Sequence, residues 1–344
     1  MDSFRKRVTV IMPTYNGEKY IQEQVSSISG QSFRDFSLHI YDDSSTDETV
    51  RIVADLAAQD KRIYLHRNIC QKGVKKNISD ALAEIGSDIY FLADQDDIWL
   101  PEKMATQLRA LLPEDVVMSF SNLLLVDKNG QSLGIDFWNS QEINPSEANQ
   151  AEIIAIKTMV TGCTMAFKKR LLDIALPIPG QATMHDHWLS FFAAKTGKVV
   201  PVSEPLVLYR QHSNNTIGAS ITPRQRRDRR YEGCVTYPDF KERKYQSYHD
   251  LLISICTFEQ RLKEHNLDQP SLKKYIAFYE RLINHQWIGA LYVALKTRRL
   301  PRTNGLLRTL GLTFFFPLVF LFLKFFKNVG NSSGQLRNKG LNPW

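Results

Sequence analysis

The chain has 344 residues, of which 43% are hydrophobic and 23% are charged. This composition excludes wholesale disorder, and the length suffices for one large domain with a smaller appendage. The formal net charge of +8 is compatible with an anionic membrane surface, a nucleic acid or a phosphorylated substrate, and it does not distinguish among them.

The first hundred residues alternate short apolar runs with amphipathic stretches. This alternation predicts strands at the following ranges: Val8–Met12, Ser37–Tyr41, Arg62–His66 and Ile89–Ala93. It predicts three helices: Glu18–Ser29, a second that runs from the motif at Ser45 to about Gln59, and Lys75–Ile85. The second helix opens at Ser45-Thr46-Asp47-Glu48, which has the pattern of a capping box. Strands that alternate with helices indicate a parallel sheet with right-handed crossovers, so we expect an α/β fold.

Beyond the next predicted helix, Pro101–Leu112, the pattern is less regular. Further strands are expected at Val116–Ser121, Thr164–Phe167 and Pro205–Tyr209. Further helices are expected at Lys169–Ala175 and Asp186–Thr196. We therefore assign residues 1–220 to one α/β domain.

From residue 221 the character of the chain changes. Pro223–Arg230 holds five arginines in eight residues, and Asp239–Arg299 is charged with helical spacing. We expect a helical region over 221–305, an apolar membrane-associating helix over 306–328 and a polar tail over 329–344.

The apolar helix has Leu310–Phe326 as its centre, with one charge and one proline in seventeen residues. This is shorter than the roughly 20 apolar residues that a bilayer span requires. A buried core helix, a transmembrane span and an interfacial helix are all compatible with it. We favour the interfacial helix, because the flanking basic residues suit anionic lipid.

The four cysteines form neither a CxxC pair nor a zinc-like spacing, which predicts reduced thiols: Cys70, Cys163, Cys234 and Cys256. No signal peptide precedes the first strand-like segment. We therefore expect the body of the protein to lie in the cytoplasm.

The polar cluster after the fourth predicted strand is the most informative site signal. Asp94, Gln95 and Asp96 directly follow the apolar run Ile89–Ala93. Ligands of open α/β sheets collect beyond the carboxyl ends of strands, and these oxygen donors suit Mg²⁺ or Mn²⁺ carried by a phosphate ligand. Clustered carboxylates repel one another unless a cation lies among them, so a metal-diphosphate site is predicted.

A second acidic pair, Asp42 and Asp43, ends the second predicted strand. The turn after the first strand, Pro13–Gly17, lacks the GxGxxG pattern, which disfavours a dehydrogenase. Tyr15 could stack on a nucleobase while Asp42 or Asp43 binds the base or the ribose. The alternative is a plain turn with a helix-capping acid.

Two later motifs carry candidate catalytic residues. Asp186 lies in His185-Asp186-His187-Trp188 and could act as a general base, or it could be a helix N-cap. The HxH spacing could also indicate zinc, but the remaining ligands are not evident. After the last predicted strand, His212 could complete the metal shell and Arg210 could meet phosphate oxygens, with a solvated loop as the alternative.

Together these motifs resemble the family 2 glycosyltransferases of GT-A fold, which are inverting. The chain is most similar to bacterial rhamnosyltransferases of cell-wall and O-antigen polysaccharide assembly, over about residues 6 to 220. Five motifs in order carry the resemblance: Val10-Ile11-Met12-Pro13-Thr14-Tyr15-Asn16-Gly17, Asp42-Asp43-Ser44-Ser45-Thr46-Asp47, Ala93-Asp94-Gln95-Asp96-Asp97-Ile98-Trp99, His185-Asp186-His187-Trp188 and Tyr209-Arg210-Gln211-His212-Ser213-Asn214-Asn215.

The resemblance implies a role for each matching residue. Pro13, Tyr15 and Asp42 would frame the nucleotide, Asn77 would face the donor, Asp94 and Asp96 would serve the sugar-nucleotide and its metal, Asp186 would be the base and His212 a metal ligand. The family commonly has Glu before the base, whereas this chain has His185.

The resemblance also implies a reaction. A sugar, L-rhamnose from dTDP-β-L-rhamnose, would move to a hydroxyl of a lipid-linked saccharide acceptor, at the cytoplasmic face of the cell membrane. The protein would be peripheral or anchored through its C-terminal region. The alternatives are a UDP-hexose or UDP-N-acetylhexosamine transferase, or a non-catalytic basic adaptor for membranes or nucleic acid. Acids at three sites argue against the adaptor, so we expect no nucleic-acid partner.

Overall fold

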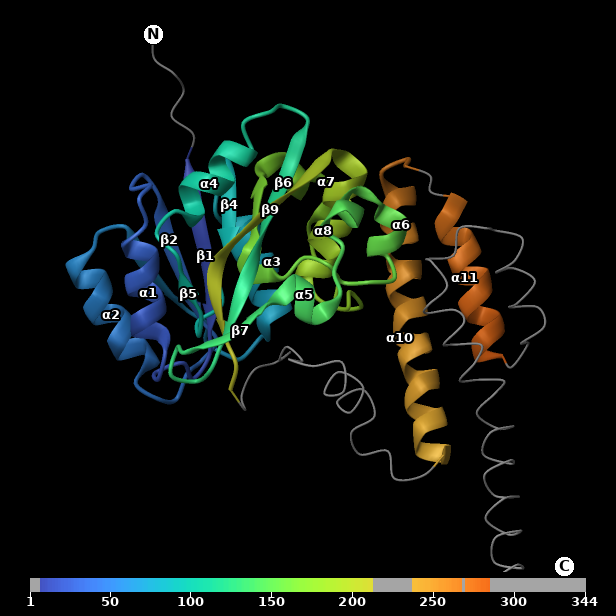
Figure 1. Cartoon of the computed structure of the whole chain (residues 1–344), viewed down its shortest axis with the longest axis horizontal. Helices are drawn as coiled ribbons and strands as arrows, with labels where there is room; N and C mark the ends of the chain where they lie inside the picture. Colours follow the sequence, from blue (N-terminus) through green and yellow to red (C-terminus); the bar gives the residue numbers. More distant parts are fainter. Residues whose placement is uncertain (1–6, 213–236, 268–269, 285–344) are drawn as a thin grey trace, which may run out of the picture. The chain divides into compact units, whose positions relative to one another are not determined.

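The computed structural model describes residues 7–212, 237–267 and 270–284 (Figure 1). The predicted apolar helix over 306–328, the polar tail and the arginine-rich stretch Pro223–Arg230 lie outside the described residues. Within the described ranges, no helix combines the length and the apolarity that a membrane span requires.

One nine-stranded sheet forms the centre of the fold, in the order β3-β2-β1-β4-β8-β6-β9-β5, with β7 paired to β6. The strands are β1 (Val8–Thr14), β2 (Ser37–Asp42), β3 (Ile63–Arg67), β4 (Ile89–Leu92), β5 (Ile98–Trp99), β6 (Val116–Val126), β7 (Ser132–Asp136), β8 (Met165–Lys168) and β9 (Lys198–Arg210). The first four strands pair in parallel, as the alternating sequence predicts. β8 is antiparallel to both β4 and β6, and β9 is parallel to β6.

Helices connect and flank the strands (Figure 1). They are α1 (Ile21–Ser29), α2 (Thr49–Gln59), α3 (Val74–Glu84), α4 (Lys103–Ala110), α5 (Phe137–Gln141), α6 (Ala151–Ile154), α7 (Leu172–Ala175), α8 (His185–Thr196), α10 (Tyr237–Glu264) and α11 (Pro270–Ile283). α1 contacts α2, and α3 contacts β1 and α8. The expected α/β architecture with flanking helices is therefore confirmed.

The predicted capping box at the start of α2 is wrong. The helix begins at Thr49, and Asp47 Oδ1 accepts a hydrogen bond from the Thr49 amide at 3.0 Å. The Ser45 hydroxyl accepts instead from the amide of Asn16, at 2.9 Å. The Ser45 side chain therefore joins the loop after β1 to the loop after β2. This contact with Asn16 takes the place of a hydrogen bond to the first turn of α2.

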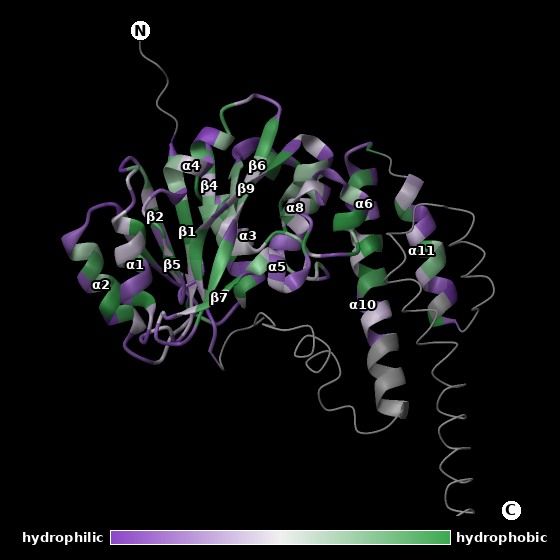
Figure 2. Ribbon diagram, in the orientation of Figure 1, coloured by the Kyte–Doolittle hydropathy of each residue, from purple (hydrophilic) through white to green (hydrophobic). Residues whose placement is uncertain are grey.

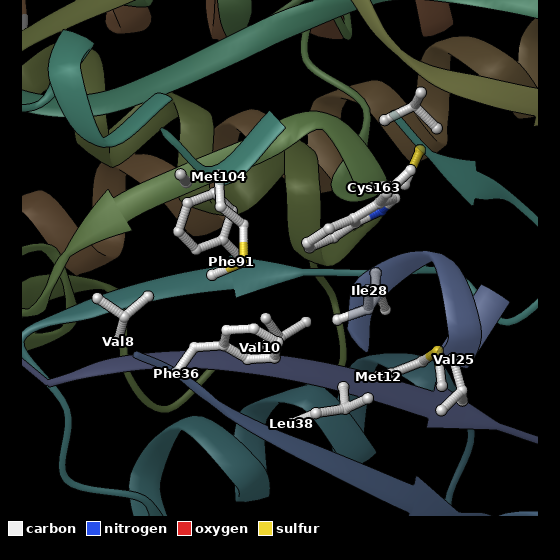
Figure 3. Packing of buried hydrophobic residues seen from close by; sticks show 14 of the residues in the cluster. Val8, Val10, Met12, Val25, Ile28, Phe36, Leu38, Phe91, Met104 and Cys163 are labelled. Carbon is white, nitrogen blue, oxygen red and sulfur yellow. The ribbon is translucent and has the colours of Figure 1, made fainter. Parts of the chain in front are cut away.

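The core lies between the sheet and its helices. Val10 and Leu38 come from adjacent strands and are fully buried, as is Phe91 on β4, and Val25 of α1 packs onto the same cluster (Figure 3). Colouring by hydropathy shows strands that are largely hydrophobic and loops that are mostly hydrophilic (Figure 2). Burial of these apolar side chains holds the sheet rigid, so its strand ends form a fixed frame for polar loops.

The first C-terminal helix, α10, packs on α8. Phe258 of α10 is 1% exposed, and its ring stacks on Phe191 with a centroid distance of 4.0 Å and on Trp188 at 5.2 Å. Arg261 donates hydrogen bonds to the carbonyl oxygens of Ile174 and Leu176, both at 2.9 Å. The sequence predicts helix in this region, but nothing in the sequence predicts that it completes the core behind α8.

Candidate active site

The strand order reverses direction between β1 and β4. β1, β2 and β3 are added in one direction, and the chain then returns to place β4 on the other side of β1. Loops that follow two such strands diverge and leave a crevice at their carboxyl ends, where open α/β sheets bind ligands. The loop containing Tyr15 follows β1 and the loop containing Asp94 follows β4, so both lie at this switch point of the sheet.

Gln95 joins these two loops. Its side-chain oxygen accepts hydrogen bonds from the Tyr15 amide at 3.0 Å and the Thr14 hydroxyl at 2.5 Å, and its side-chain nitrogen donates to the Tyr15 carbonyl at 3.1 Å. Gly17 is needed beside it, because a Cβ at that position would collide with the Gln95 amide. Gln95, predicted as a donor-binding residue, is therefore bonded to protein through both ends of its amide.

The Tyr15 side chain is 42% exposed at the end of β1, beside the partly buried Pro13. An exposed ring at this position can stack on a planar ligand. The β1 loop is joined to the β2 loop as well, because the Gly17 amide donates to the Thr49 hydroxyl at 2.7 Å. The structure thus brings the predicted first and second motifs together.

The two acids after β2 have different surroundings. Asp43 accepts hydrogen bonds from the amides of Lys72 and Gly73, both at 2.8 Å, and from the Asn68 side chain at 3.0 Å. Asp42 accepts from the Ser45 amide at 3.0 Å, while its other oxygen is buried with no hydrogen-bond partner among the described residues. Asp43 therefore holds the loop before α3, whereas Asp42 has one carboxylate oxygen left unpaired among the described residues.

Asn77, which the resemblance places towards the donor, is 1% exposed in the first turns of α3. Its side chain donates to the Tyr41 carbonyl and accepts from Asn68, both at 3.1 Å. These contacts support the loop that Asp43 holds.

The acids after β4 form the electrostatic centre of the site. Burial, together with the negative charges of Asp96 and Asp186, raises the pKa of Asp94 to about 7. Burial and the charges of Asp96 and Asp94 raise the pKa of Asp97 well above its usual range. Asp186, far along the chain from the other two acids, reaches the same region, because it binds the Gly162 amide next to Cys163, whose thiol lies within 4.8 Å of Asp94. Asp96 and Asp186 thus both repel Asp94, and a cation among these acids would relieve the repulsion.

Asp96 and His212 fit two ligands of one metal ion. Asp96 Oδ2 and His212 Nε2 form a hydrogen bond of 2.9 Å, and this separation is also compatible with shared metal ligation. Adjacent ligands of an octahedral ion with bonds of about 2.1 Å lie roughly 3 Å apart. An imidazole beside carboxylates suits Mn²⁺ better than Mg²⁺, which prefers oxygen.

Two of the acids after β4 belong to a largely buried cluster that the sequence did not reveal. Asp94, Asp97 and the thiol of Cys163 each offer an atom within 4.8 Å of the others. Lys103 of α4 is fully buried nearby, its ammonium donates to Gln107 Oε1 at 2.5 Å, and burial lowers its pKa to about 7. Lys103 follows an ordinary helical pattern in the sequence, so no local signal marks it as buried.

Asp186 lies in the first turn of α8, two residues beyond the N-cap position, which is held by Met184. Its carboxylate accepts hydrogen bonds from the amides of His187 at 2.7 Å and Gly162 at 3.2 Å. Negative charge is stabilised at this end of a helix. The N-cap interpretation of Asp186 is therefore wrong, and the side chain remains a candidate base.

The flanking histidines do not form a zinc site. His187 Nε2 is paired with the Ile154 carbonyl at 2.5 Å, whereas His185 packs against Gly162. Residues two apart on a helix do not face each other, so the two imidazoles diverge. Both ring nitrogens of His185 are buried without a hydrogen-bond partner among the described residues.

Arg210 is 2% exposed and is held by protein groups on several sides. Its guanidinium donates to Glu23 Oε2 at 2.5 Å, to the Asp96 carbonyl at 2.9 Å and to the Lys128 carbonyl at 3.1 Å. These contacts support a structural role for Arg210, and the predicted contact with phosphate oxygens stays a prediction.

The sheet therefore reverses its strand order beside a cluster of carboxylates. Residues 9–174 match the family model described as Glycosyl transferase family 2. The dTDP-rhamnosyl transferase RfbG of Shigella flexneri is 30% identical over 224 residues, which cover 61% of this chain and 75% of that protein. The chain therefore belongs to glycosyl transferase family 2 and is a glycosyltransferase.

Other relatives support the same family. The putative teichuronic acid biosynthesis glycosyltransferase TuaG of Bacillus subtilis (strain 168) is 28% identical, with 62% of this chain and 83% of that protein covered. The solved structure of S. aureus TarS 1-349 in complex with UDP-GlcNAc shares the fold, with a TM-score of 0.53 and 20% identity. That match covers 80% of this chain and 72% of the TarS chain, and it confirms the predicted GT-A fold.

Proposed function

We propose that this protein is an inverting rhamnosyltransferase that moves L-rhamnose from dTDP-β-L-rhamnose to a hydroxyl of a lipid-linked cell-surface polysaccharide precursor. The relative named dTDP-rhamnosyl transferase, with 30% identity over 224 residues, supports the donor. Another relative, from Escherichia coli, is named as a glucosyltransferase acting on a diphosphoundecaprenol-linked sugar, which supports a lipid-linked acceptor.

One observation carries the mechanism: Asp186, from α8, binds the Gly162 amide, and the thiol of the adjacent Cys163 lies within 4.8 Å of the acids Asp94 and Asp97 after β4. A base on one side of the crevice and a diphosphate site on the other side would bracket a sugar between them. This arrangement suits a single displacement with inversion.

In the proposed reaction, Asp186 takes the proton of the acceptor hydroxyl as the oxygen attacks the anomeric carbon. The new C–O bond forms on the face opposite the nucleotide. The bond from the anomeric carbon to the diphosphate oxygen breaks, and dTDP leaves with the electron pair. The product is an α-L-rhamnoside.

The donor would lie across the β1–β4 crevice. Tyr15 would stack on the base beside Pro13, and Asp42 would bind the base or ribose through its unpaired oxygen. Asp43, Asn77 and Gln95 would hold the loops of this subsite in place, as their hydrogen bonds indicate.

Divalent metal use is common in this family and fits the side chains present. Asp96 and His212 would hold Mg²⁺ or Mn²⁺, with Asp94 nearby. When bound, the ion would neutralise the charge of the departing diphosphate.

We further propose that the protein works at the cytoplasmic face of the cell membrane, either peripherally or through its C-terminal anchor. A lipid-linked acceptor and the apolar, basic-flanked segment over 306–328 support this location. Flotation of the full-length protein with anionic and neutral vesicles would test it, and equal absence from both vesicle fractions would contradict it.

The decisive experiment is a donor panel. The purified protein is given a lipid-linked acceptor and either dTDP-β-L-rhamnose or UDP-sugars, with and without EDTA. Transfer from dTDP-rhamnose alone, abolished by EDTA, is expected. Transfer only from a UDP-hexose or UDP-N-acetylhexosamine would establish the alternative donor class.

The base is tested by Asp186→Asn. Loss of general base catalysis should lower kcat by about 10²–10⁴-fold while the dissociation constant of the donor stays nearly unchanged. Asp173→Asn, at an exposed acid on α7, is the matched control and should behave as wild type. Near-normal turnover in Asp186→Asn would show that another group is the base.

A further inference from the structure

Arg210 is a charged side chain that is almost entirely buried. It is the last residue of β9, two positions before His212. A buried guanidinium is tolerated only where its donors are paired. Arg210 meets this requirement through the carboxylate of Glu23 on α1, the carbonyl of Asp96 after β4 and the carbonyl of Lys128 in the β6–β7 turn. One side chain thus joins β9 to three other parts of the fold.

The Arg210 side chain also contacts Tyr20, whose ring stacks on His212. The Arg210 guanidinium lies 4.7 Å from the centroid of the Tyr20 ring. His212 stacks on Tyr20, with a centroid distance of 5.0 Å and an interplanar angle of 25°. Tyr20 therefore contacts both Arg210 and the imidazole that faces Asp96.

The backbone of Arg210 is fixed as well. Its amide donates to Asp97 Oδ1 at 3.2 Å, which ties the end of β9 to the residue that follows Asp96. Both sides of the Asp96–His212 pair are thereby attached to Arg210: Asp96 through its carbonyl and His212 through the chain and through Tyr20.

We propose that Arg210 is a positioning residue of the metal site, which holds Asp96 and His212 at ligand spacing before a cation arrives. This inference deepens the proposed function, because it takes Asp96 and His212 as the metal ligands. Preorganised ligands lose less conformational entropy on binding, so loss of the arginine should weaken metal binding without removing a ligand. Partners that orient metal ligands typically contribute about 10–100-fold to metal affinity.

The geometry requires arginine and not merely a positive charge. The three acceptors lie in three directions around one planar group, and a lysine ammonium on its flexible stem cannot reproduce that fork. Arg210→Lys therefore keeps the charge and loses most of the positioning.

The test measures Mn²⁺ binding to the full-length protein in the absence of any nucleotide-sugar, by the EPR signal of free Mn²⁺. We expect Arg210→Lys and Arg210→Gln to raise the dissociation constant about 10–100-fold. Glu23→Gln removes only the half-exposed ionic partner and should raise it several-fold. Arg51→Gln, at an arginine that is 65% exposed and also paired with acids, is the matched control and should bind as wild type.

A second readout separates positioning from ligation. Saturating Mn²⁺ should restore kcat of Arg210→Lys towards that of wild type, whereas His212→Ala should not recover. Thermal unfolding followed by circular dichroism identifies any variant that fails to fold, and Glu23→Gln then carries the test.

Two outcomes would overturn the proposal. The first is Mn²⁺ binding within about 2-fold of wild type in Arg210→Lys together with weakened dTDP binding, which would establish a direct contact with phosphate. The second is unchanged Mn²⁺ affinity in a folded Glu23→Gln and Arg210→Gln pair. Because no donor is present, these results are independent of whether rhamnose is the transferred sugar.

Discussion

Phe258 offers a direct test of how the C-terminal helical region contributes to the catalytic domain. Its ring is 1% exposed and lies 4.0 Å from the centroid of Phe191 and 5.2 Å from that of Trp188. It also meets His187 edge-on at 5.3 Å. All three neighbours belong to α8, the helix that carries Asp186 in its first turn.

Replacing Phe258 by alanine should lower the free energy of unfolding by about 3–5 kcal/mol, the usual range for a buried Phe→Ala change. The upper part of this range is expected, because four ring contacts with α8, including one with Phe192, are lost along with the transfer free energy of the ring. Urea unfolding followed by far-ultraviolet circular dichroism and by tryptophan fluorescence measures the change, and Trp188 reports directly on α8.

Ile253→Ala is the matched control, since this residue lies on the same helix but is 37% exposed. It should cost about 1 kcal/mol or less. A loss below about 1 kcal/mol for Phe258→Ala as well would refute the packing of α10 on α8.

Three further perturbations follow from single contacts. A Cβ at Gly162 would lie 2.6 Å from His185 Nε2, so Gly162→Ala should displace the amide that holds the base and lower kcat by about 10²-fold in a transfer assay. Gly17→Ala should push the Gln95 amide out of place and weaken dTDP binding measured by calorimetry. Burial lowers the pKa of His39 to about 4. In the unfolded chain the pKa of this histidine is about 6.5, so between pH 6.5 and about 4 the unfolded chain is protonated at His39 while the folded protein is not. The free energy of unfolding should therefore fall as the pH is lowered through this range, and it should fall less in His39→Gln.

Each of these has a distinct contrary result. Wild-type kcat in Gly162→Ala would mean that the loop moves aside without disturbing the base. Unchanged dTDP affinity in Gly17→Ala would separate the loop junction from the donor subsite. Equal pH slopes of wild type and His39→Gln in urea unfolding would show that other groups govern acid stability.

Local patterns sufficed for the parallel half of the sheet. The runs that became β1 to β4 are short, apolar and separated by amphipathic helices, so hydrophobic burial alone selects their structure. Because parallel strands end at one rim, the meeting of the Tyr15 and Asp94 loops followed from the topology.

The strand β8 was predicted from its apolar run, but its antiparallel place in the sheet and the two-residue strand β5 were beyond such reasoning. β8 is inserted between β4 and β6 by pairing with both, and β5 exists only because β9 pairs with it. Their formation depends on partners far along the chain, which periodicity does not encode.

The uses of individual polar side chains were equally hidden. Asp94, Asp96 and Asp97 are neighbours in one loop, yet only Asp97 is fully buried. Arg210 is paired with Glu23, 187 residues earlier in the chain. These differences depend on three-dimensional proximity. A motif can therefore predict which residue types occur at a site, but not which of them is buried and which is paired with another part of the protein.

The hydrogen bonds between the β1 and β4 loops have a consequence for which substitutions the site can tolerate. The Gln95 side chain forms hydrogen bonds with the main chain of Tyr15, at both the amide and the carbonyl of that residue. The side chain of Tyr15 can therefore be replaced without loss of the hydrogen bonds that join the two loops. If Tyr15 stacks on the base as proposed, a substitution at this one position would alter the contact with the nucleotide and leave the junction between the β1 and β4 loops intact.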